Sequence, residues 1–270
     1  MLAGMRDPYA LQFLPVRYSL IIFLARLPMI GSAVSRHAER YMDRRWTAGP
    51  RASAVARTKL IDDLTAAAVA DGARQVLLLG AGYDSRAYRM PELASLPVFE
   101  VDHPATQAEK RRLIWDSNGK HVHFVPVDLL VDDLAGALRQ FGLHTGQPTV
   151  VIWEGVTNYL SAEAVDNTLR YLASALATGS RIIFTYVDRA AIDGTKQFSG
   201  YQQWHASVSD VGEQWTFGWH PAELDAYLAE RAMTLMLDLS AREAAARYLE
   251  PLGRHEPAAA FYRIAEAQVR

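Results

Sequence analysis

The chain has 270 residues, of which 50% are hydrophobic and 21% are charged, so it can form one large hydrophobic core or two smaller ones. Its formal net charge of -2 gives no reason to expect a nucleic acid or an anionic membrane as a partner. Cysteine is absent, which excludes disulfides, thiolate metal sites and cysteine nucleophiles.

The N-terminal part of the chain contains an apolar stretch over residues 11–30 that is interrupted by two arginines and two prolines. A membrane-spanning helix needs about 20 mostly apolar residues with few charges, so we expect no stable membrane insertion. No signal peptide is indicated either. We expect residues 1–55 to form a helical extension packed on the domain, or a lid over a hydrophobic substrate, in a cytoplasmic protein.

From residue 73 onward, short apolar runs alternate with longer amphipathic segments, which is the pattern of βαβ units and a parallel sheet. Pro126 lies in the third run and indicates a bulge or an edge position there. The predicted strands are residues 75–79, 98–101, 122–127, 149–153, 181–187, 234–240 and 261–268. The predicted helices are residues 56–71, 106–117, 133–141, 161–177 and 221–231.

This order of elements predicts one α/β domain with a Rossmann-like sheet. Residues 56–187 form its predicted core, and residues 221–270 add a C-terminal helix and two strands. Between them, residues 188–220 are rich in glycine, serine, glutamine and aromatic residues, so we predict a cap-like insertion there.

An acidic residue stands at the C-terminal end of four predicted strands: Asp102, Asp128, Glu154 and Asp188. In an open α/β sheet the ligand crevice lies outside the carboxyl ends of the strands. Each acid alone could be a helix N-cap or part of a surface ion pair. Together they predict a ligand with several hydrogen-bond donors at this edge of the sheet.

The first predicted strand is followed by a turn that contains Gly80 and Gly82, which allow a ligand to approach the backbone. A dinucleotide fingerprint would need a third glycine where Ser85 stands, and the carboxylate of Asp84 would repel a pyrophosphate. The turn therefore disfavours a nicotinamide or flavin dinucleotide, and with it a dehydrogenase.

S-adenosyl-L-methionine (SAM) matches these charges better. Asp102 lies about 20 residues beyond the glycine turn, the spacing of ribose recognition in nucleotide-binding folds. Asp128 could accept a hydrogen bond from the adenine amine, and Glu154 could pair with the ammonium group. The carboxylate of the methionine moiety needs an arginine, for which Arg57 and Arg86 are the candidates.

Several of these segments resemble the bacterial branch of the leucine carboxyl methyltransferase family, over about residues 55 to 240. The resemblance implies the class I methyltransferase fold, which is a mostly parallel sheet of seven strands with the last one antiparallel, and SAM as the cofactor. The similar segments are Arg57-Thr58 with Asp62-Asp63, and residues 75–89, 99–104, 127–129, 154–160 and 212–218. The pair Thr157-Asn158 is more polar than is usual for this family.

The resemblance also implies a role for individual residues. Tyr159 would line the path to the substrate. The cofactor-binding residues would be Arg57 at the methionine carboxylate, Gly80 and Gly82 in the turn, Asp102 at the ribose, Asp128 and Leu129 at the adenine, and Glu154 at the amino group.

The family includes enzymes that methylate a protein C-terminal carboxylate and bacterial enzymes that act on small metabolites, including polyketide acids. The bacterial motifs favour O-methylation of a small-molecule carboxylate, as in secondary metabolism. A carboxylate is already ionised and needs no base, whereas a phenol or hydroxyl acceptor would need one, for which His205 and His220 are the candidates. A protein C-terminus as acceptor, and a cofactor-binding protein without catalysis, are further alternatives.

Five aromatic residues could form a dry wall around the reacting groups, or could be ordinary core residues: Tyr201, Trp204, Trp215, Phe217 and Trp219. No cluster of histidines and acids has the spacing of metal ligands, so no metal is expected. The sequence does not decide between a monomer and a homodimer.

Overall fold

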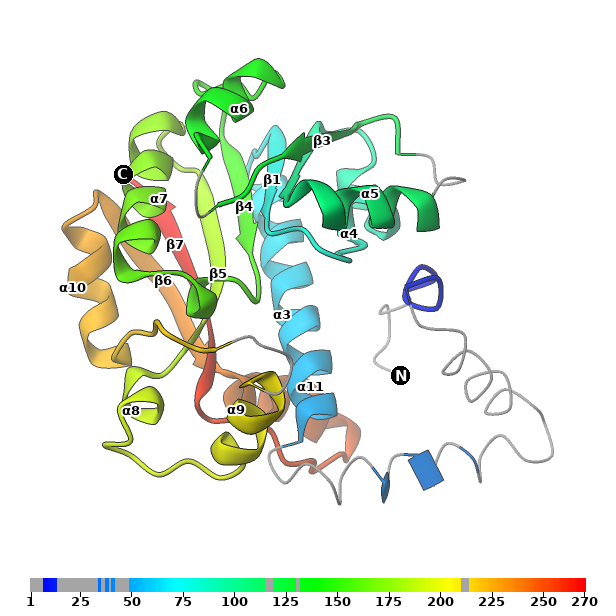
Figure 1. Cartoon of the computed structure of the whole chain (residues 1–270), viewed down its shortest axis with the longest axis vertical. Helices are drawn as coiled ribbons and strands as arrows, with labels where there is room; N and C mark the ends of the chain where they lie inside the picture. Colours follow the sequence, from blue (N-terminus) through cyan, green and yellow to red (C-terminus); the bar gives the residue numbers. More distant parts are fainter. Residues whose placement is uncertain are drawn as a thin grey trace.

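The computed structural model describes residues 7–13, 34, 37–38, 40–41, 49–114, 119–129, 132–209 and 214–270. Its centre is a sheet with the strand order β3-β2-β1-β4-β5-β7-β6 (Figure 1). Strands β1 to β5 pair in parallel, and β7 is antiparallel to both β5 and β6. The strands are β1 (Gln75–Leu79), β2 (Val98–Asp102), β3 (Val122–Pro126), β4 (Thr149–Trp153), β5 (Arg181–Val187), β6 (Met233–Ser240) and β7 (Tyr262–Val269).

The predicted fold class is therefore confirmed, and every predicted strand end lies within one residue of the observed end. Pro126 is the last residue of β3, which is an edge strand, where a missing N–H group does not interrupt a ladder. The strands β1 and β4 are buried along their whole length, as expected for parallel strands covered on both faces.

Helices cover both faces of the sheet, and successive residues of β1 pack alternately toward one face and the other. Figure 1 shows α3 and α11 side by side along one face. The helices of this face are α3 (Pro50–Ala70), α4 (Arg86–Arg89) and α11 (Ala241–Leu249), and those of the opposite face are α6 (Leu134–Gln140), α7 (Ala162–Ala175) and α10 (Leu224–Ala229).

The helices differ from the prediction more than the strands do. Helix α3 begins at Pro50, because proline is well tolerated in the first turn of a helix. The predicted helix over residues 221–231 is a short 3₁₀ turn (Pro221–Glu223) followed by α10. Helix α11 was not predicted, although Ser240 and Glu243 form a capping box at its start. Helix α5 (Pro104–Leu113) begins after His103, whose side chain accepts a hydrogen bond from the Ala105 N–H group.

The segment predicted as a cap-like insertion contains α8 (Arg189–Ile192) and α9 (Tyr201–Ser209). Its aromatic residues do not form a single wall. Tyr201, Trp204 and Trp215 pack around the ring of Phe261 in the cluster on one side of the sheet. Phe217 and Trp219 contact each other in the cluster on the opposite side.

Among the described residues, no helix combines the length and the apolar character needed to cross a membrane. The predicted extension or lid over residues 1–55 lies largely outside the described residues, and so does most of the apolar stretch over residues 11–30.

Strand β2 carries a fully buried carboxylate, Glu100, whose side chain lies 2.8 Å from the ammonium group of Lys110 in α5. Lys110 also donates a hydrogen bond of 2.7 Å to the carbonyl oxygen of Asp84. Burial raises the pKa of Glu100 to about 7, because the attraction of Lys110 offsets the loss of solvation only in part. Lys110 therefore links β2 to the turn after β1, and both charged groups of the pair lose their contact with water.

We predict that Lys110→Met lowers the free energy of unfolding by about 3–5 kcal/mol at pH 8, because it leaves the buried Glu100 carboxylate without its cationic partner. The loss should be smaller at pH 5.5, where Glu100 can take up a proton and become neutral. Urea denaturation at the two pH values measures both effects. The double variant Glu100→Gln/Lys110→Met is the control and should recover most of the loss; an equal loss at both pH values would contradict the prediction.

Candidate functional site

The candidate site lies where the chain connections of the sheet reverse direction. Strands β1 and β4 are neighbours, but the chain continues from β1 to β2 on one side and from β4 to β5 on the other. Ligands bind at such a switch point in open α/β sheets. A cavity of ≈ 330 Å³ opens here, lined by Asp7, Arg57, Thr58, Leu78, Leu79, Gly80, Ala81, Gly82, Tyr83, Asp84, Ser85, Arg86, Arg89, Ile152, Glu154 and Gly155.

Glycine is required at the floor of this cavity. Gly80 has a φ of 65°, and a Cβ atom placed on it would lie 2.3 Å from Cγ2 of Val156. Gly82 also has a positive φ, and its N–H group donates to the Oδ2 atom of Asp102. The glycine turn thus packs closely on the segment after β4 and is held by the end of β2.

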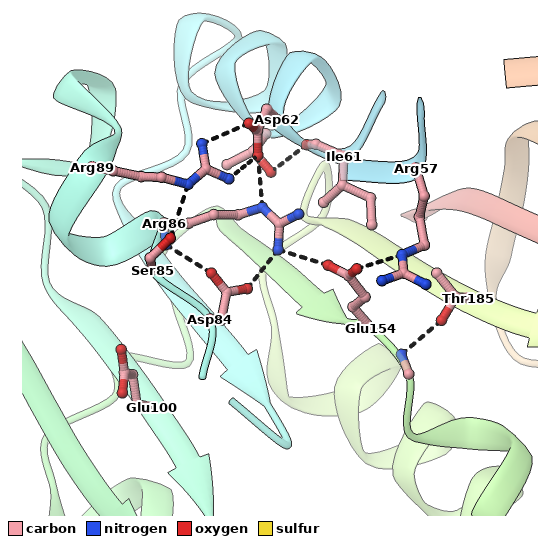
Figure 2. A network of polar contacts seen from close by, with 12 residues as sticks. Arg57, Ile61, Asp62, Asp84, Ser85, Arg86, Arg89, Glu100, Glu154 and Thr185 are labelled. Atoms are coloured by element: carbon pink, nitrogen blue, oxygen red, sulfur yellow. Dashed lines mark hydrogen bonds and ion pairs between the residues drawn. The ribbon is translucent and has the colours of Figure 1, made fainter. Parts of the chain in front are cut away.

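The cavity wall contains a network of arginines and carboxylates centred on Glu154 (Figure 2). The Oε1 atom of Glu154 lies 2.6 Å from Nε of Arg57, and its Oε2 atom accepts a hydrogen bond of 2.7 Å from Nη1 of Arg86. The guanidinium of Arg57 also lies over the ring of Tyr262, 5.4 Å from the ring centroid. Helices α3 and α4 therefore each supply one arginine to the carboxylate at the end of β4.

These neighbours control the charge of Glu154. Burial raises the pKa of this carboxyl group, but the guanidiniums of Arg86 and Arg57 outweigh that effect and lower the pKa to about 2. Glu154 is thus an anion at neutral pH. The same carboxylate raises the pKa of Arg57 above its ordinary value, although burial alone would lower it.

The two arginines that the sequence left open as candidates differ in their surroundings. The side chain of Arg86 is 3% exposed and contacts three carboxylates, those of Asp62, Asp84 and Glu154. The side chain of Arg57 is 25% exposed and contacts the carboxylate of Glu154. Arg57 is therefore better placed to receive another anion from the cavity.

The other acidic residues at strand ends have distinct environments. Asp102 holds the N–H groups of Gly82 and His103, the latter at 2.6 Å. Asp128 follows β3, and its N–H group donates to Asp132 at 2.8 Å. Asp188 caps α8, because its carboxylate accepts a hydrogen bond of 3.0 Å from the Ala190 N–H group. A helix N-cap was one of the alternatives that the sequence allowed for this residue.

Several predicted site residues do not line the cavity. Leu129 lies in a separate surface hollow between α6 and α7. Tyr159 packs against the hydrophobic cluster on the side of the sheet that α3 and α11 cover. His205 lies between the rings of Tyr201 and Trp215, with centroid distances of 5.6 and 6.0 Å. His220 precedes the 3₁₀ turn at Pro221–Glu223. Their predicted roles stay predictions.

A short turn near the N-terminus contacts the glycine turn. Asp7 lines the cavity and accepts a hydrogen bond of 2.7 Å from the Ser85 hydroxyl. The rings of Tyr9 and Phe13 contact those of Tyr88 and Tyr83, respectively. The side chain of Asp7 also accepts hydrogen bonds from the N–H groups of Tyr9 and Ala10, which fixes the turn locally.

Sequence reasoning missed the carboxylates and hydroxyls that support the site. Asp62 of α3 accepts from Arg86 at 2.8 Å and from two nitrogens of Arg89 at 2.7 and 2.8 Å. Thr185 of β5 accepts from the Gly155 N–H group at 2.7 Å and contacts the Tyr262 hydroxyl at 3.0 Å. Asp62 could have been found as part of a similar segment, whereas nothing in the sequence marks Tyr262.

No group of three or more histidine, aspartate or glutamate side chains suited to a metal ion is found in the part of the chain that the structure describes.

The strand order, with β7 antiparallel between β5 and β6, is that of the class I methyltransferase fold. Two crystal structures share this fold at 17% sequence identity. One is a methyltransferase, named provisionally as such, from Thermobifida fusca YX, with a TM-score of 0.62 and 88% of each chain covered. The other is a DUF574 family protein from Streptomyces avermitilis, with a TM-score of 0.59 and coverage of 93% of this chain and 96% of that one.

Residues 4–173 match the model of the leucine carboxyl methyltransferase family, and the chain belongs to this family. A relative from Frankia alni is 38% identical over 191 residues, which are 70% of this chain and 63% of that protein. One from Streptomyces coelicolor is 36% identical over 188 residues, which are 67% and 66% of the two chains. Both are named, provisionally, as SAM-dependent methyltransferases. The chain thus spans slightly less than two thirds of these relatives.

We predict that Gly80→Ala lowers the free energy of unfolding by more than the ~1–3 kcal/mol of a strained backbone conformation, because the added methyl group also collides with Val156. The matched control is Gly253→Ala, because Gly253 has a φ of 70° and open space around the Cβ position. This variant should lose only the stability that corresponds to the strained backbone. Urea denaturation compares the two, and Val156→Ala should partly rescue Gly80→Ala. Equal losses in both glycine variants would contradict the close packing.

Proposed function

We propose that this chain is a SAM-dependent O-methyltransferase that acts on a small-molecule carboxylate. The observation that carries the proposal is the pairing of Arg57 with Glu154 on the wall of the cavity at the switch point. An α-amino acid group carries one positive and one negative charge. It can insert at such a pair and exchange one ion pair for two, with its carboxylate on Arg57 and its ammonium group on Glu154.

The other strand ends supply the polar groups that the rest of the cofactor needs. Asp102, at the end of β2, would accept hydrogen bonds from the ribose hydroxyls. Asp128 and Leu129, after β3, would bind the adenine. Gly80 and Gly82 would let the cofactor approach the backbone of the turn. The donor set fits SAM because it offers carboxylates for the diol and the ammonium group and one arginine for the carboxylate.

Bound SAM supplies a methyl group on a positively charged sulfur, which an ionised carboxylate can accept without a general base. The protein then needs to align the two reactants and to exclude water, and alignment can contribute on the order of 7–11 kcal/mol. This agrees with a cavity whose lining, in the described part of the chain, includes no histidine. Tyr159, in the segment after Glu154, would border the acceptor.

We predict that SAM binds the purified chain and that Asp102→Ala weakens the affinity about tenfold or more, through loss of the contacts to the ribose. Isothermal titration calorimetry measures this. Asp188→Ala is the matched control, because it removes an acid at another strand end whose carboxylate caps α8, and it should bind within about threefold of the wild type. Tighter binding of NAD than of SAM would contradict the proposal.

We also predict that the methylated product is an ester. With SAM labelled on its methyl group and a panel of carboxylic acids, phenols and peptides, the label should enter acids and be released as methanol by mild alkali, which leaves aryl ethers intact. His205→Gln and His220→Gln should keep the rate within about threefold, because no base is needed. Alkali-stable product, with a loss of about 10²-fold or more in a histidine variant, would instead support a phenol acceptor. Label on a peptide C-terminus alone would favour a protein acceptor.

A further inference from the structure

We propose that Arg86 is a positioning residue for cofactor binding, which holds Glu154 ionised and correctly oriented while the ligand engages the opposite oxygen of that carboxylate. This inference rests on the proposed function, since it concerns the site where the amino group of SAM would bind.

Arg86 joins the three segments that build the cavity wall. Its Nε atom donates to Asp62 of α3 at 2.8 Å, and its Nη1 atom donates to Asp84 at 2.5 Å and to Glu154 at 2.7 Å. The N–H group of Arg86 also donates to Asp84 at 2.7 Å, so the Asp84 carboxylate is held from two sides. Figure 2 shows the guanidinium between these three carboxylates.

The two arginines on Glu154 use different oxygen atoms. Arg57 lies against Oε1 and Arg86 binds Oε2. An incoming ammonium group can therefore replace Arg57 at Oε1 without disturbing the contact with Arg86. Without Arg86, Glu154 would depend on Arg57 alone, and the ligand carboxylate would compete for that same guanidinium.

The geometry needs a guanidinium and not merely a positive charge. Arg86 binds its three carboxylates through two separate nitrogen atoms, Nε to Asp62 and Nη1 to Asp84 and Glu154, and the single nitrogen of lysine cannot occupy both positions. The side chain is 3% exposed, so water cannot replace a missing contact easily. The charged and titratable groups around Glu154 include Arg57 from α3, Arg86 from α4 and Tyr262 from β7, together with Asp84, which binds the same Nη1 atom of Arg86.

The test is binding of S-adenosylhomocysteine, which has the same amino acid group, to the full chain by calorimetry. Arg86→Lys should weaken the affinity about tenfold or more at pH 7.5. The affinity of the variant should fall by about a further threefold or more between pH 7.5 and 5, because Glu154 is largely withdrawn from water and takes up a proton more easily without Arg86. The wild type should stay constant over this range.

A matched control separates this role from general stability. Arg181 is the first residue of β5, at the amino end of the strand and away from the cavity, and it binds Glu266 at 2.9 Å and Asp71 at 3.0 Å. Arg181→Lys should lower the melting temperature but leave the affinity and its pH profile as in the wild type. In a Glu154→Gln variant, adding Arg86→Lys should lower the affinity by less than about threefold, because the group through which Arg86 acts is already neutral.

If Arg86→Lys does not fold, Glu154→Asp tests the same contact, since Arg86 keeps Asp62 and Asp84 while the shortened carboxylate withdraws from it. This variant should show the same pH-dependent loss of affinity. Two results would overturn the inference. One is an affinity of the variant that does not change with pH. The other is an equal loss of affinity on Arg86→Lys in the wild type and in the Glu154→Gln variant. Failure of the wild type to bind S-adenosylhomocysteine at all would instead overturn the proposed function.

Discussion

The site depends on a carboxylate that is largely withdrawn from water and nevertheless ionised. Moving the Glu154 side chain out of water favours its neutral form, and two guanidiniums reverse that preference. Neither arginine belongs to the strand that carries Glu154, so the charge of this group requires that α3, α4 and β4 be assembled correctly. The negative charge of Glu154 at the cavity wall is thus a property of the folded domain and not of one segment.

The remaining structure supplies the supports for this arrangement. Arg86 can approach Glu154 because the turn after β1 is tight, and the turn is tight because Gly80 has a left-handed conformation beside Val156. The turn is held further by Asp102 through the Gly82 N–H group and by Lys110 through the carbonyl of Asp84. Strand β2, helix α5 and the segment after β4 therefore all fix one short loop, which limits how the cavity can change shape.

The strands could be predicted from the sequence, whereas the side-chain contacts between separate helices and strands could not. Buried parallel strands are short apolar runs with clear ends, so their limits could be predicted to one residue. The acids after these strands mark the correct edge of the sheet, because parallel strands all end there. Helix α11 was not predicted, because it is short and directly follows a strand, although the sequence contains its capping box at Ser240 and Glu243. That Asp62 would bind both Arg86 and Arg89 depends on how α3 packs, which no local pattern encodes.

The structure also changes one argument against a dinucleotide. From the sequence, Asp84 was expected to repel a pyrophosphate, but its carboxylate is bound by the N–H group and the guanidinium of Arg86. What opposes a pyrophosphate is the charge of the whole network. Its three guanidiniums are those of Arg57, Arg86 and Arg89, and its four carboxylates are those of Asp7, Asp62, Asp84 and Glu154.

A cavity wall with this balance offers a pyrophosphate no net attraction, and a ligand with two negative charges would have to displace carboxylates that are already paired. An amino acid group has no net charge and presents both signs a short distance apart. It can therefore satisfy Arg57 and Glu154 together while the pairs of Arg86 and Arg89 stay intact. Under the proposed function, a preference for SAM over a dinucleotide would follow from which ion pairs each ligand would have to break, and the paired state of Asp84 would contribute to that preference.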